Sequence, residues 1–433
     1  MNDLKRRTLL GMLGTSAVTA PLLAACGGTG GGPAGSSGDG STLRFAYWGG
    51  AERQALYTEG IAGFIEETGI QVEEQFASYD AFQERMTTQI AGSDVPAVFW
   101  IPSAQVMTYA DAGIYRTLDD VESFDLSDFE DEDIESYQLD GVLNSFPKSV
   151  FSACVRYNRT MLEEAGAELP SGENWTWDGF AEFLIDYSAD NGEGRKGTTY
   201  NAYSDMALEA WMRQRGVDLW TEDGRLGAGA DDFASWFDWW EKLREKGATT
   251  TISEQDGAQP DWTLTGDMVL TTFANTNHII DEAPMFPDYE FAMAEVPASA
   301  DALEGWPFLY LSRFAMYEGA SDELVADAGA FMSYTVNSLD MLKIVGLSAG
   351  APPNPRLLET AKADAGPLET KVLEITSQIR ERDRGPRYEA PDGTGTWRDK
   401  VVAAIEQITL GDASIMDASQ GLVDSIDAEM GSA

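Results

Sequence analysis

The sequence has 433 residues, which is enough for two or three domains with a sizeable buried core. Hydrophobic residues make up 43% of the chain and aromatic residues 11%, a composition that excludes intrinsic disorder for the bulk of it. The formal net charge of −44 repels phosphate backbones and anionic lipid headgroups, and therefore argues against nucleic-acid binding and electrostatic membrane docking.

The first 25 residues have the features of an export signal. Basic residues at 5–7 precede a mildly apolar stretch, 9–23, that is too short to span a bilayer as a permanent helix. The run Arg6-Arg7-Thr8-Leu9-Leu10 is typical of a twin-arginine (Tat) signal, although a general secretion signal also tolerates two arginines. The run Leu23-Ala24-Ala25-Cys26 resembles the lipobox of bacterial lipoproteins. We therefore expect a signal peptide over 1–25, lipidation of Cys26 with acyl chains such as palmitate, and an exported lipoprotein anchored to the outer face of the cell membrane.

Residues 26–42 contain Cys26 and a segment made almost wholly of Gly, Ser, Pro, Ala and Thr, which is typical of a flexible tether. The spacing Gly30-x-Gly32-x-x-Gly35 matches a dinucleotide-binding fingerprint. We interpret it as accidental, because no strand pattern precedes it and no helix pattern follows. The only other cysteine is Cys154, so acylation of Cys26 leaves the chain without an intramolecular disulfide.

Strand and helix patterns alternate through the first part of the body. Strands are predicted over 43–48, 70–76 and 98–101, and helices after Gly49-Gly50 through Ile65, around Phe82, Met86 and Ile90, and over 106–112. This alternation predicts a parallel, doubly wound α/β sheet. Ligands of such sheets bind at the carboxyl ends of strands, which is where Trp48 and Trp100 fall. The acidic stretch 119–135 is interpreted as an exposed connection.

The second part of the body has the same character. A strand-like run over 150–157 is followed by a helix over 177–187, and further strands are predicted over 268–273, 291–296 and 309–316, with helices over 325–334 and 401–408. Five aromatic residues lie on helix-like stretches, where aromatic stripes usually pack in the core: Trp211, Trp236, Phe237, Trp239 and Trp240.

Six stretches carry a resemblance to a known family, and they occur in the family's order. They are Phe64-Ile65-Glu66-Glu67-Thr68-Gly69-Ile70-Gln71-Val72, 90–98 (with Ala97 where the family usually has Asp), 109–115, Tyr157-Asn158-Arg159 and its continuation to 166, Gly266-Asp267-Met268-Val269-Leu270, and Gly350-Ala351-Pro352-Pro353-Asn354. From about residue 43 to the C-terminus, the chain resembles the family-1 extracytoplasmic solute-binding proteins of ABC importers, the sugar-binding group that includes maltose-binding protein.

This resemblance implies an α/β, two-lobe periplasmic-binding-protein-like fold of type II, with doubly wound sheets joined by a hinge of crossing segments. Lobe 1 is expected over 43–150 plus about 300–352, and lobe 2 over 151–299 plus about 353–433. The crossings are expected near 151–154, 294–300 and 350–356. A solute that contacts both lobes only in the closed state would shift the population toward that state.

The implied function is that of a membrane-anchored extracytoplasmic receptor that captures a mono- or oligosaccharide and delivers it to an ABC importer. Its expected partners are the sugar, the permease subunits of the transporter, and the membrane through the lipid anchor. We expect a monomer that does not bind nucleic acid, needs no cofactor or metal, and is not an enzyme.

Sugar binding requires aromatic faces for the C–H patches of pyranose rings, with polar side chains for the hydroxyls. The candidates in the first lobe are Trp48, Glu52, Tyr79, Gln83, Trp100 and Ser103. Those in the second lobe and the return segment are Tyr203, Asn275, Thr276, Trp306 and Phe308. The resemblance implies a stacking or bonding tryptophan at Trp100. The alternative for Trp48 and Trp100 is packing in the core, and for Trp306 and Phe308 it is a plug between the lobes.

Two motifs suggest an enzyme, and the sequence argues against both. Gly346-Leu347-Ser348-Ala349-Gly350 matches a nucleophile elbow, but a helix-like pattern precedes Ser348 and the single histidine, His278, lies upstream instead of downstream. Cys154 lies in an apolar strand, where cysteines are usually inert, which disfavours a thiol dyad with His278.

Two alternatives stay open. One is a non-sugar solute such as a polyamine, because an acidic and aromatic cleft would suit a cation. The other is a secreted lipoprotein glycosidase, because 73 acidic residues make some close carboxylate pair inevitable, although nothing singles one out.

Overall fold

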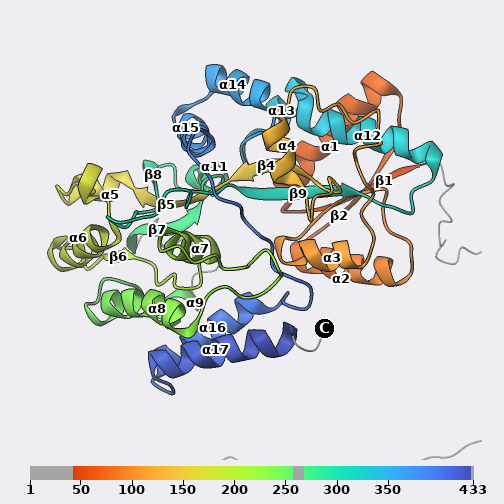
Figure 1. Ribbon diagram of the computed structural model, residues 1–433. Helices are drawn as coiled ribbons and strands as arrows, with labels where there is room; N and C mark the ends of the chain where they lie inside the picture. The colour runs from red at the N-terminus through yellow and green to blue at the C-terminus, as the bar shows by residue number, and fades with distance from the viewer. Residues whose placement is uncertain (1–41, 257–267, 431–433) are drawn as a thin grey trace, which may run out of the picture. The chain divides into compact units, whose positions relative to one another are not determined.

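Two mixed β-sheets organise the chain (Figure 1). The computed structural model describes residues 42–256 and 268–430. The predicted signal peptide, the lipidation site Cys26 and the tether therefore lie outside the described residues.

The first sheet has five strands in the order β2-β1-β3-β9-β4. Their bounds are β1 Leu43–Trp48, β2 Val72–Ala77, β3 Val98–Trp100, β4 Phe146–Phe151 and β9 Tyr310–Met316. β1 pairs in parallel with both β2 and β3, as the sequence predicts, whereas β9 is antiparallel to both β3 and β4. The expectation of a parallel sheet is wrong for this part of the sheet. The chain passes directly from β4 into the second sheet and comes back from the second sheet into β9, so no helical crossover, which parallel neighbours require, connects these strands.

Six helices lie with the first sheet. They are α1 Ala51–Thr68, α2 Tyr79–Ala91, α3 Val106–Asp111, α4 Asp131–Tyr137, α12 Asp322–Asn337 and α13 Leu339–Val345, with a 3₁₀ turn η1 at Ser103–Gln105. α1 packs closely on α13, and Gly60 makes this possible, since a Cβ at that position would lie 2.4 Å from the Met341 sulfur. Phe45, Phe64 and Phe331 meet in the core beneath these helices.

The stretch 119–135 is more than an exposed connection. Val121, Phe124 and Phe129 are buried in the first core, and the last residues of the stretch begin α4. The buried apolar residues of this stretch are widely spaced among acidic ones, so the sequence pattern did not predict that they pack in the core.

The second sheet has four strands in the order β6-β7-β5-β8. Their bounds are β5 Ala153–Asn158, β6 Lys196–Thr198, β7 Val269–Asn275 and β8 Phe291–Glu295. β5 is antiparallel to β7 and β8, and β6 is parallel to β7. The run that the sequence predicts as one strand over 150–157 is therefore divided at Ser152 between β4 of the first sheet and β5 of the second.

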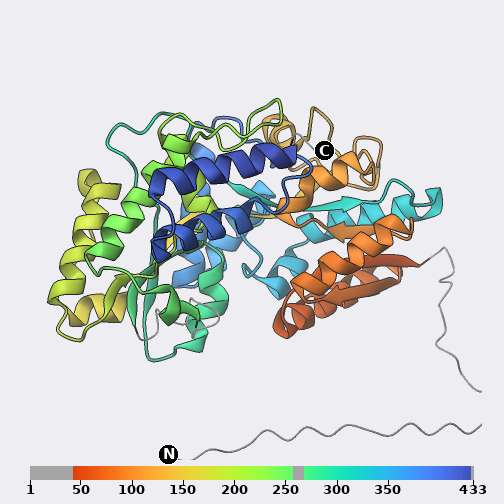
Figure 2. The ribbon, with the colours of Figure 1, turned by 90° about the horizontal axis from the view of Figure 1, so that it is seen from below.

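The remaining helices lie with the second sheet. They are α5 Arg159–Glu164, α6 Trp177–Asp190, α7 Asp205–Gln214, α8 Ala230–Glu245, α9 Ile252–Asp256, α11 His278–Glu282, α14 Pro355–Asp364, α15 Pro367–Glu381, α16 Trp397–Leu410 and α17 Ile415–Met430, with 3₁₀ turns η2 at Gly172–Asn174 and η4 at Ala283–Met285. α16 and α17 lie side by side, and α17 packs on α8 (Figure 2).

An aromatic cluster forms the core beside the second sheet. Trp177 contacts Trp211, Trp236 and Trp239, with ring centroids 5.1 to 5.8 Å apart. The prediction that the tryptophans of the helix-like stretches are core residues is confirmed. Within residues 42–256 and 268–430, none of the helices combines the length and the apolar character needed to cross a bilayer.

Three segments pass from one sheet to the other. The first is at Ser152, whose carbonyl accepts a hydrogen bond of 2.9 Å from the Thr276 amide. The second comes later than 294–300, because Ala298 and Leu303 still bond to Trp175 and Gln214 beside the second sheet, and the chain enters β9 only at Tyr310. In the third segment, Ala351 pairs with Val150 of β4 before α14 begins.

Candidate ligand-binding site

The parallel strands of the first sheet deliver aromatic and polar side chains to one edge. Trp48 ends β1, Tyr79 follows β2 and Ser103 follows β3. Trp48 is half-buried and its ring lies 5.4 Å from that of Tyr79, which is 39% exposed. These two rings therefore combine apolar area with access to solvent, as stacking against a sugar requires.

Trp100 does not share this exposure. It is 1% exposed, and its ring packs edge-on against Trp48 and Tyr57, at 5.1 Å from each. Lys148 of β4 covers the ring, with its Nζ atom 3.7 Å from the centroid. In this structure Trp100 packs in the core, the alternative prediction for it, because Tyr57 of α1 and Lys148 of β4 cover its ring.

A polar cluster from α16 and α7 lies within electrostatic reach of Tyr79. The Arg398 guanidinium donates hydrogen bonds to the Ser103 hydroxyl at 3.2 Å and to the Tyr310 hydroxyl at 3.0 Å. It also forms an ion pair of 2.5 Å with Asp205 at the start of α7. Burial raises the pKa of the Tyr79 hydroxyl, and the positive charge of Arg398 opposes that shift, which places the two side chains within electrostatic reach.

Sequence reasoning missed Arg398, Asp205 and Tyr310. Arg398 is 295 residues from Ser103, and no local pattern marks it as a partner of that residue. Of the three, only Tyr310 lies in an element that the sequence predicts, the strand over 309–316. Its ring stacks on that of Phe151, the last residue of β4, at 5.5 Å.

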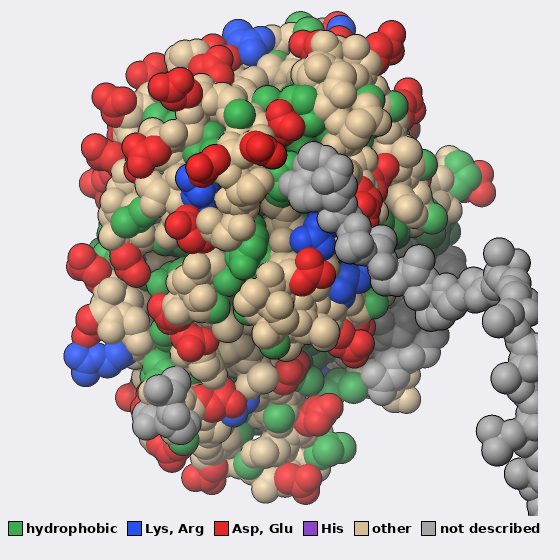
Figure 3. Space-filling view, turned by 90° about the vertical axis from the view of Figure 1, so that its right-hand side faces the viewer, with side chains coloured by type: hydrophobic (Ala, Val, Ile, Leu, Met, Phe, Trp, Pro, Cys, Tyr) green, Lys and Arg blue, Asp and Glu red, His purple; other side chains and the backbone are tan. Residues whose placement is uncertain are grey.

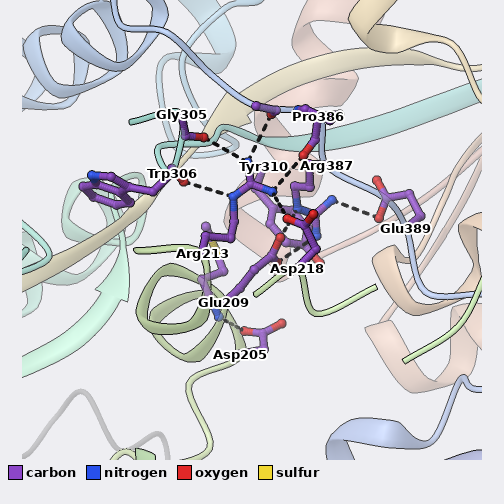
Figure 4. Close-up of polar contacts among 12 residues, drawn as sticks. Asp205, Glu209, Arg213, Asp218, Gly305, Trp306, Tyr310, Pro386, Arg387 and Glu389 are labelled. Atoms are coloured by element: carbon purple, nitrogen blue, oxygen red, sulfur yellow. Dashed lines mark hydrogen bonds and ion pairs between the residues drawn. The ribbon is translucent and has the colours of Figure 1, made fainter. Parts of the chain in front are cut away.

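Buried ion pairs lie next to Tyr310 (Figure 4). Arg387 donates two hydrogen bonds, of 2.7 and 3.1 Å, to the carboxylate of Glu209 on α7. Its guanidinium lies 4.4 Å from the centre of the Tyr310 ring. Arg387 also pairs with Glu389 at 3.1 Å, and Glu389 lies 3.7 Å from Arg313 of β9. The segment 382–396, between α15 and α16, is thereby fixed to elements of both sheets.

Arg213 fixes the return segment that carries two of the predicted residues. Its Nε, Nη1 and Nη2 atoms donate five hydrogen bonds, of 2.8 to 3.2 Å, to the side chain of Asp218 and to the carbonyls of Gly305, Trp306, Gly385 and Pro386 (Figure 4). Trp306 is half-buried with Arg382 over its ring. Phe308 is buried, with the guanidinium groups of Arg213 and Arg387 each 5.6 Å from its ring centre. Phe308 therefore offers no free ring face, which contradicts its prediction as a ring that supplies one.

The second half of the site lies where α1 approaches the carboxyl end of β7. Arg53 of α1 donates a long hydrogen bond of 3.4 Å to the Ser348 carbonyl and lies 3.7 Å from Asp281 of α11. The Ser348 carbonyl also accepts a bond of 2.7 Å from the Asn277 amide group. Asn275, at the end of β7, lies 3.4 Å from His278.

The His278 side chain is accessible to solvent, but its surroundings disfavour the protonated, charged form. Its side chain is 46% exposed, but desolvation together with the charges of Arg156 and Arg53 lowers its pKa to about 4. Arg156 itself forms a buried ion pair with Glu282. The imidazole is therefore neutral at physiological pH and can accept or donate a hydrogen bond.

The other predicted residues have different surroundings. Thr276 is fully buried and its hydroxyl accepts a bond of 3.3 Å from the Ser152 amide, so it holds the crossing segment and does not face solvent. Glu52 is exposed in the first turn of α1 and Gln83 is half-buried on α2. Tyr203 is 37% exposed, and its hydroxyl lies 3.5 Å from the Gln255 amide nitrogen.

The enzyme motifs have no suitable geometry. Helix α13, and not a strand, precedes Ser348, which is buried. Burial raises the pKa of the Cys154 thiol to about 12, so the nucleophilic thiolate is not populated near neutral pH. Among the described residues, no group of three His, Cys, Asp or Glu side chains is arranged to hold a metal ion.

Comparison with known proteins identifies the family. The family described as bacterial extracellular solute-binding protein matches residues 60–370. A periplasmic solute-binding protein from Pectobacterium atrosepticum has a TM-score of 0.78 at 17% identity, over 90% of this chain and 98% of that one. A periplasmic oligogalacturonide-binding protein from Yersinia enterocolitica, solved with saturated digalacturonic acid, has a TM-score of 0.76 at 17% identity, over 89% and 98%.

A third solved structure agrees with these two. The GacH receptor of Streptomyces glaucescens, studied with acarbose, has a TM-score of 0.72 at 16% identity, over 89% of this chain and 97% of that one. The two-lobe fold of type II, with two mixed sheets joined by crossing segments, is therefore shown. With a family match over well more than half of its length, the chain belongs to the bacterial extracellular solute-binding proteins.

Proposed function

We propose that this protein is a sugar receptor that delivers its ligand to an ABC importer. The observation that carries the proposal is the pairing of two solvent-accessible rings, Trp48 and Tyr79, with the Arg398 and Asp205 cluster that lies within electrostatic reach of Tyr79. Rings bind the C–H faces of pyranoses, while a carboxylate and a guanidinium bind their hydroxyls. The carbohydrates bound by the Yersinia and Streptomyces proteins support a sugar over other solutes.

Capture would proceed by hinge closure. We propose that the two sheets with their helices move as lobes, with the hinge at Ser152, between Trp306 and Tyr310, and near Ala351. Trp48, Tyr79 and Ser103 would contact the sugar from the first lobe, and Asp205, Asn275 and Arg398 from the second. A ligand held by both sides would favour the closed state by the difference in its affinity for the two states.

Delivery and anchoring complete the proposal. Cleavage before Cys26 and its acylation would tether the receptor outside the cell membrane, where the permease subunits of the transporter would receive the sugar from a monomeric receptor.

Two cations beside the aromatic pair, Arg53 and Arg398, disfavour the polyamine alternative, because they would repel a cationic ligand.

The test is a thermal-shift screen of the unacylated chain from residue 27 against mono- and oligosaccharides, polyamines and amino acids. A ligand at 100 times its dissociation constant adds about 2.7 kcal/mol of stability and raises the melting temperature. We expect a rise with one class of sugar and recovery of that sugar unaltered. A response to polyamines or amino acids alone would contradict the proposal, and loss of the sugar from the solution would indicate a glycosidase.

A further inference from the structure

A positively charged corner lies beside Trp48, in a chain whose formal net charge is −44. The face of the molecule in Figure 3 carries many Asp and Glu side chains and few Lys or Arg. The corner, in contrast, is formed by Arg53 in the first turn of α1 and by Lys148 of β4. The amino end of α1 adds positive potential, because Gly50 at its N-cap has no side chain to cap it.

Arg53 has donors that no residue of the described ranges engages closely. Within residues 42–256 and 268–430 its buried Nε atom has no hydrogen-bond partner, and its contacts to the Ser348 carbonyl and to Asp281 are 3.4 and 3.7 Å long. Arg213, by comparison, uses five donors at 2.8 to 3.2 Å. An arginine with unused donors on its fork suits a planar anion, which can accept two parallel bonds.

Lys148 has no acidic partner among the described residues. It is 8% exposed, donates no hydrogen bond within that part of the chain, and holds its Nζ atom over the ring of Trp100. Desolvation, and then the charge of Arg53, lower the pKa of Lys148 well below its ordinary value, so this corner disfavours the charged ammonium form in the absence of an anion. A like-charged pair at low dielectric is costly unless an anion compensates it.

The acidic groups near the corner do not supply that anion. Glu52 is exposed, and Asp281 is about half exposed and beyond hydrogen-bond distance of Arg53. Burial raises the pKa of Asp281 even though Arg53 acts in the opposite direction. Glu282 is already paired with Arg156, and His278 is neutral. Neither Glu52 nor Asp281 therefore engages the Arg53 fork at hydrogen-bond distance, and the fork keeps donors that a neutral sugar would not need.

We propose that the captured sugar carries an acidic group, which Arg53 binds and whose negative charge would favour the ammonium form of Lys148 over the Trp100 ring. This inference rests on the proposed function and narrows its ligand to a charged saccharide. A carboxylate at C6 of a hexose and a sulfate ester share the required chemistry. The stacking rings and the anion-binding arginine would then select the sugar ring and its charge separately.

Isothermal titration with matched pairs of sugars tests the inference. The probes are galacturonate against galactose, glucuronate against glucose, the dimers of these sugars, and galactose 6-sulfate as the second source of charge. We expect an acidic member to bind at least about tenfold more tightly than its neutral parent. The carboxylate and sulfate arms show which acidic group is preferred.

The variants separate charge recognition from folding. Arg53→Gln should reduce the preference for the acidic sugar to about threefold or less while the neutral parent still binds, and Arg53→Lys should retain an intermediate preference. Lys148→Met should also reduce the preference. Arg225→Gln removes an exposed arginine that pairs only locally with Asp223, and it should leave the preference unchanged. Circular dichroism of each variant checks its fold.

The outcomes distinguish the two proposals. A neutral sugar that binds as tightly as its acidic counterpart, or an acidic preference that survives both Arg53 variants, overturns this inference and leaves the receptor proposal intact. Absence of binding to every saccharide, acidic or neutral, overturns the receptor proposal itself.

Discussion

The Arg398 guanidinium at the start of α16 donates a hydrogen bond of 3.2 Å to the hydroxyl of Ser103, which follows β3 of the first sheet. The same guanidinium pairs with Asp205, at the start of α7 beside the second sheet. One side chain thus joins elements associated with the two sheets. Under the proposed hinge closure, in which the two sheets move as lobes, this contact re-forms each time the lobes close.

Replacement of Arg398 should therefore affect both stability and capture. Arg398→Gln removes hydrogen bonds to a charged group, each worth roughly 1.5–3 kcal/mol, and leaves Asp205 without its guanidinium. We expect a loss of roughly 1–3 kcal/mol in the free energy of unfolding by urea, and a larger radius of gyration in small-angle scattering. Unchanged scattering and unchanged sugar affinity would show that the contact plays no part in closure. Arg225→Gln serves as the exposed control.

Trp48 and Trp100 should respond differently to truncation. Trp48 is half-buried at the edge, so Trp48→Ala should weaken sugar binding more than it weakens the fold. Trp100 is fully buried among aromatic rings, and Trp100→Ala should lower the free energy of unfolding by about 3–5 kcal/mol. Urea denaturation and titration of both variants check this. If Trp48→Ala destabilises as strongly as Trp100→Ala, Trp48 is a core residue as well.

This contrast shows how far the sequence could predict the site. Both tryptophans stand at strand ends, and local pattern placed both strands correctly. The sequence could not separate the two residues, because β1 and β3 are both inner strands, and Trp100 is buried by Tyr57 of α1 and Lys148 of β4. Exposure at a strand end depends on which helices pack there, and that depends on contacts between distant parts of the chain.

The same limit explains the divided strand at Ser152. An apolar run shows that a segment is buried, but not that its neighbours change from β9 to β7 and β8 within it. The sequence predicts Thr276 as a sugar-binding residue of a loop. Its hydroxyl instead accepts a hydrogen bond from the Ser152 amide, at the point where β4 and β5 are divided. The resemblance supplied the two-lobe architecture, which local pattern alone did not.

The buried pair of Arg387 and Glu209 gives a third prediction. Arg387→Met would leave the buried Glu209 carboxylate without its bidentate partner, and we expect a loss of about 3–5 kcal/mol in the free energy of unfolding. The double variant Arg387→Met with Glu209→Met should recover much of that loss, because no uncompensated charge then remains in the pair. Urea denaturation of the single and double variants measures the coupling. Additive losses would contradict a direct interaction between the two side chains.

The single histidine gives a pH prediction that can be followed at one site. The pKa of His278 is lowered from 6.5 to about 4 by desolvation and by the charges of Arg156 and Arg53. The unfolded chain therefore binds a proton at this residue at a higher pH than the folded chain does. Protonation favours unfolding, so the contribution of His278 to stability is complete above about pH 6.5 and declines as the pH falls toward 4.

His278→Gln should remove this contribution to the pH dependence. We expect the variant and the parent to have similar stability at pH 7.5, and the variant to lose less stability between pH 6.5 and pH 4.5, as measured by urea denaturation. The imidazole resonance of the parent, which has no other histidine, should titrate well below pH 6 by NMR. A midpoint near 6.5 would show that neither desolvation nor the charges of Arg156 and Arg53 act on the ring, and it would contradict the placement of the Arg53 charge beside His278.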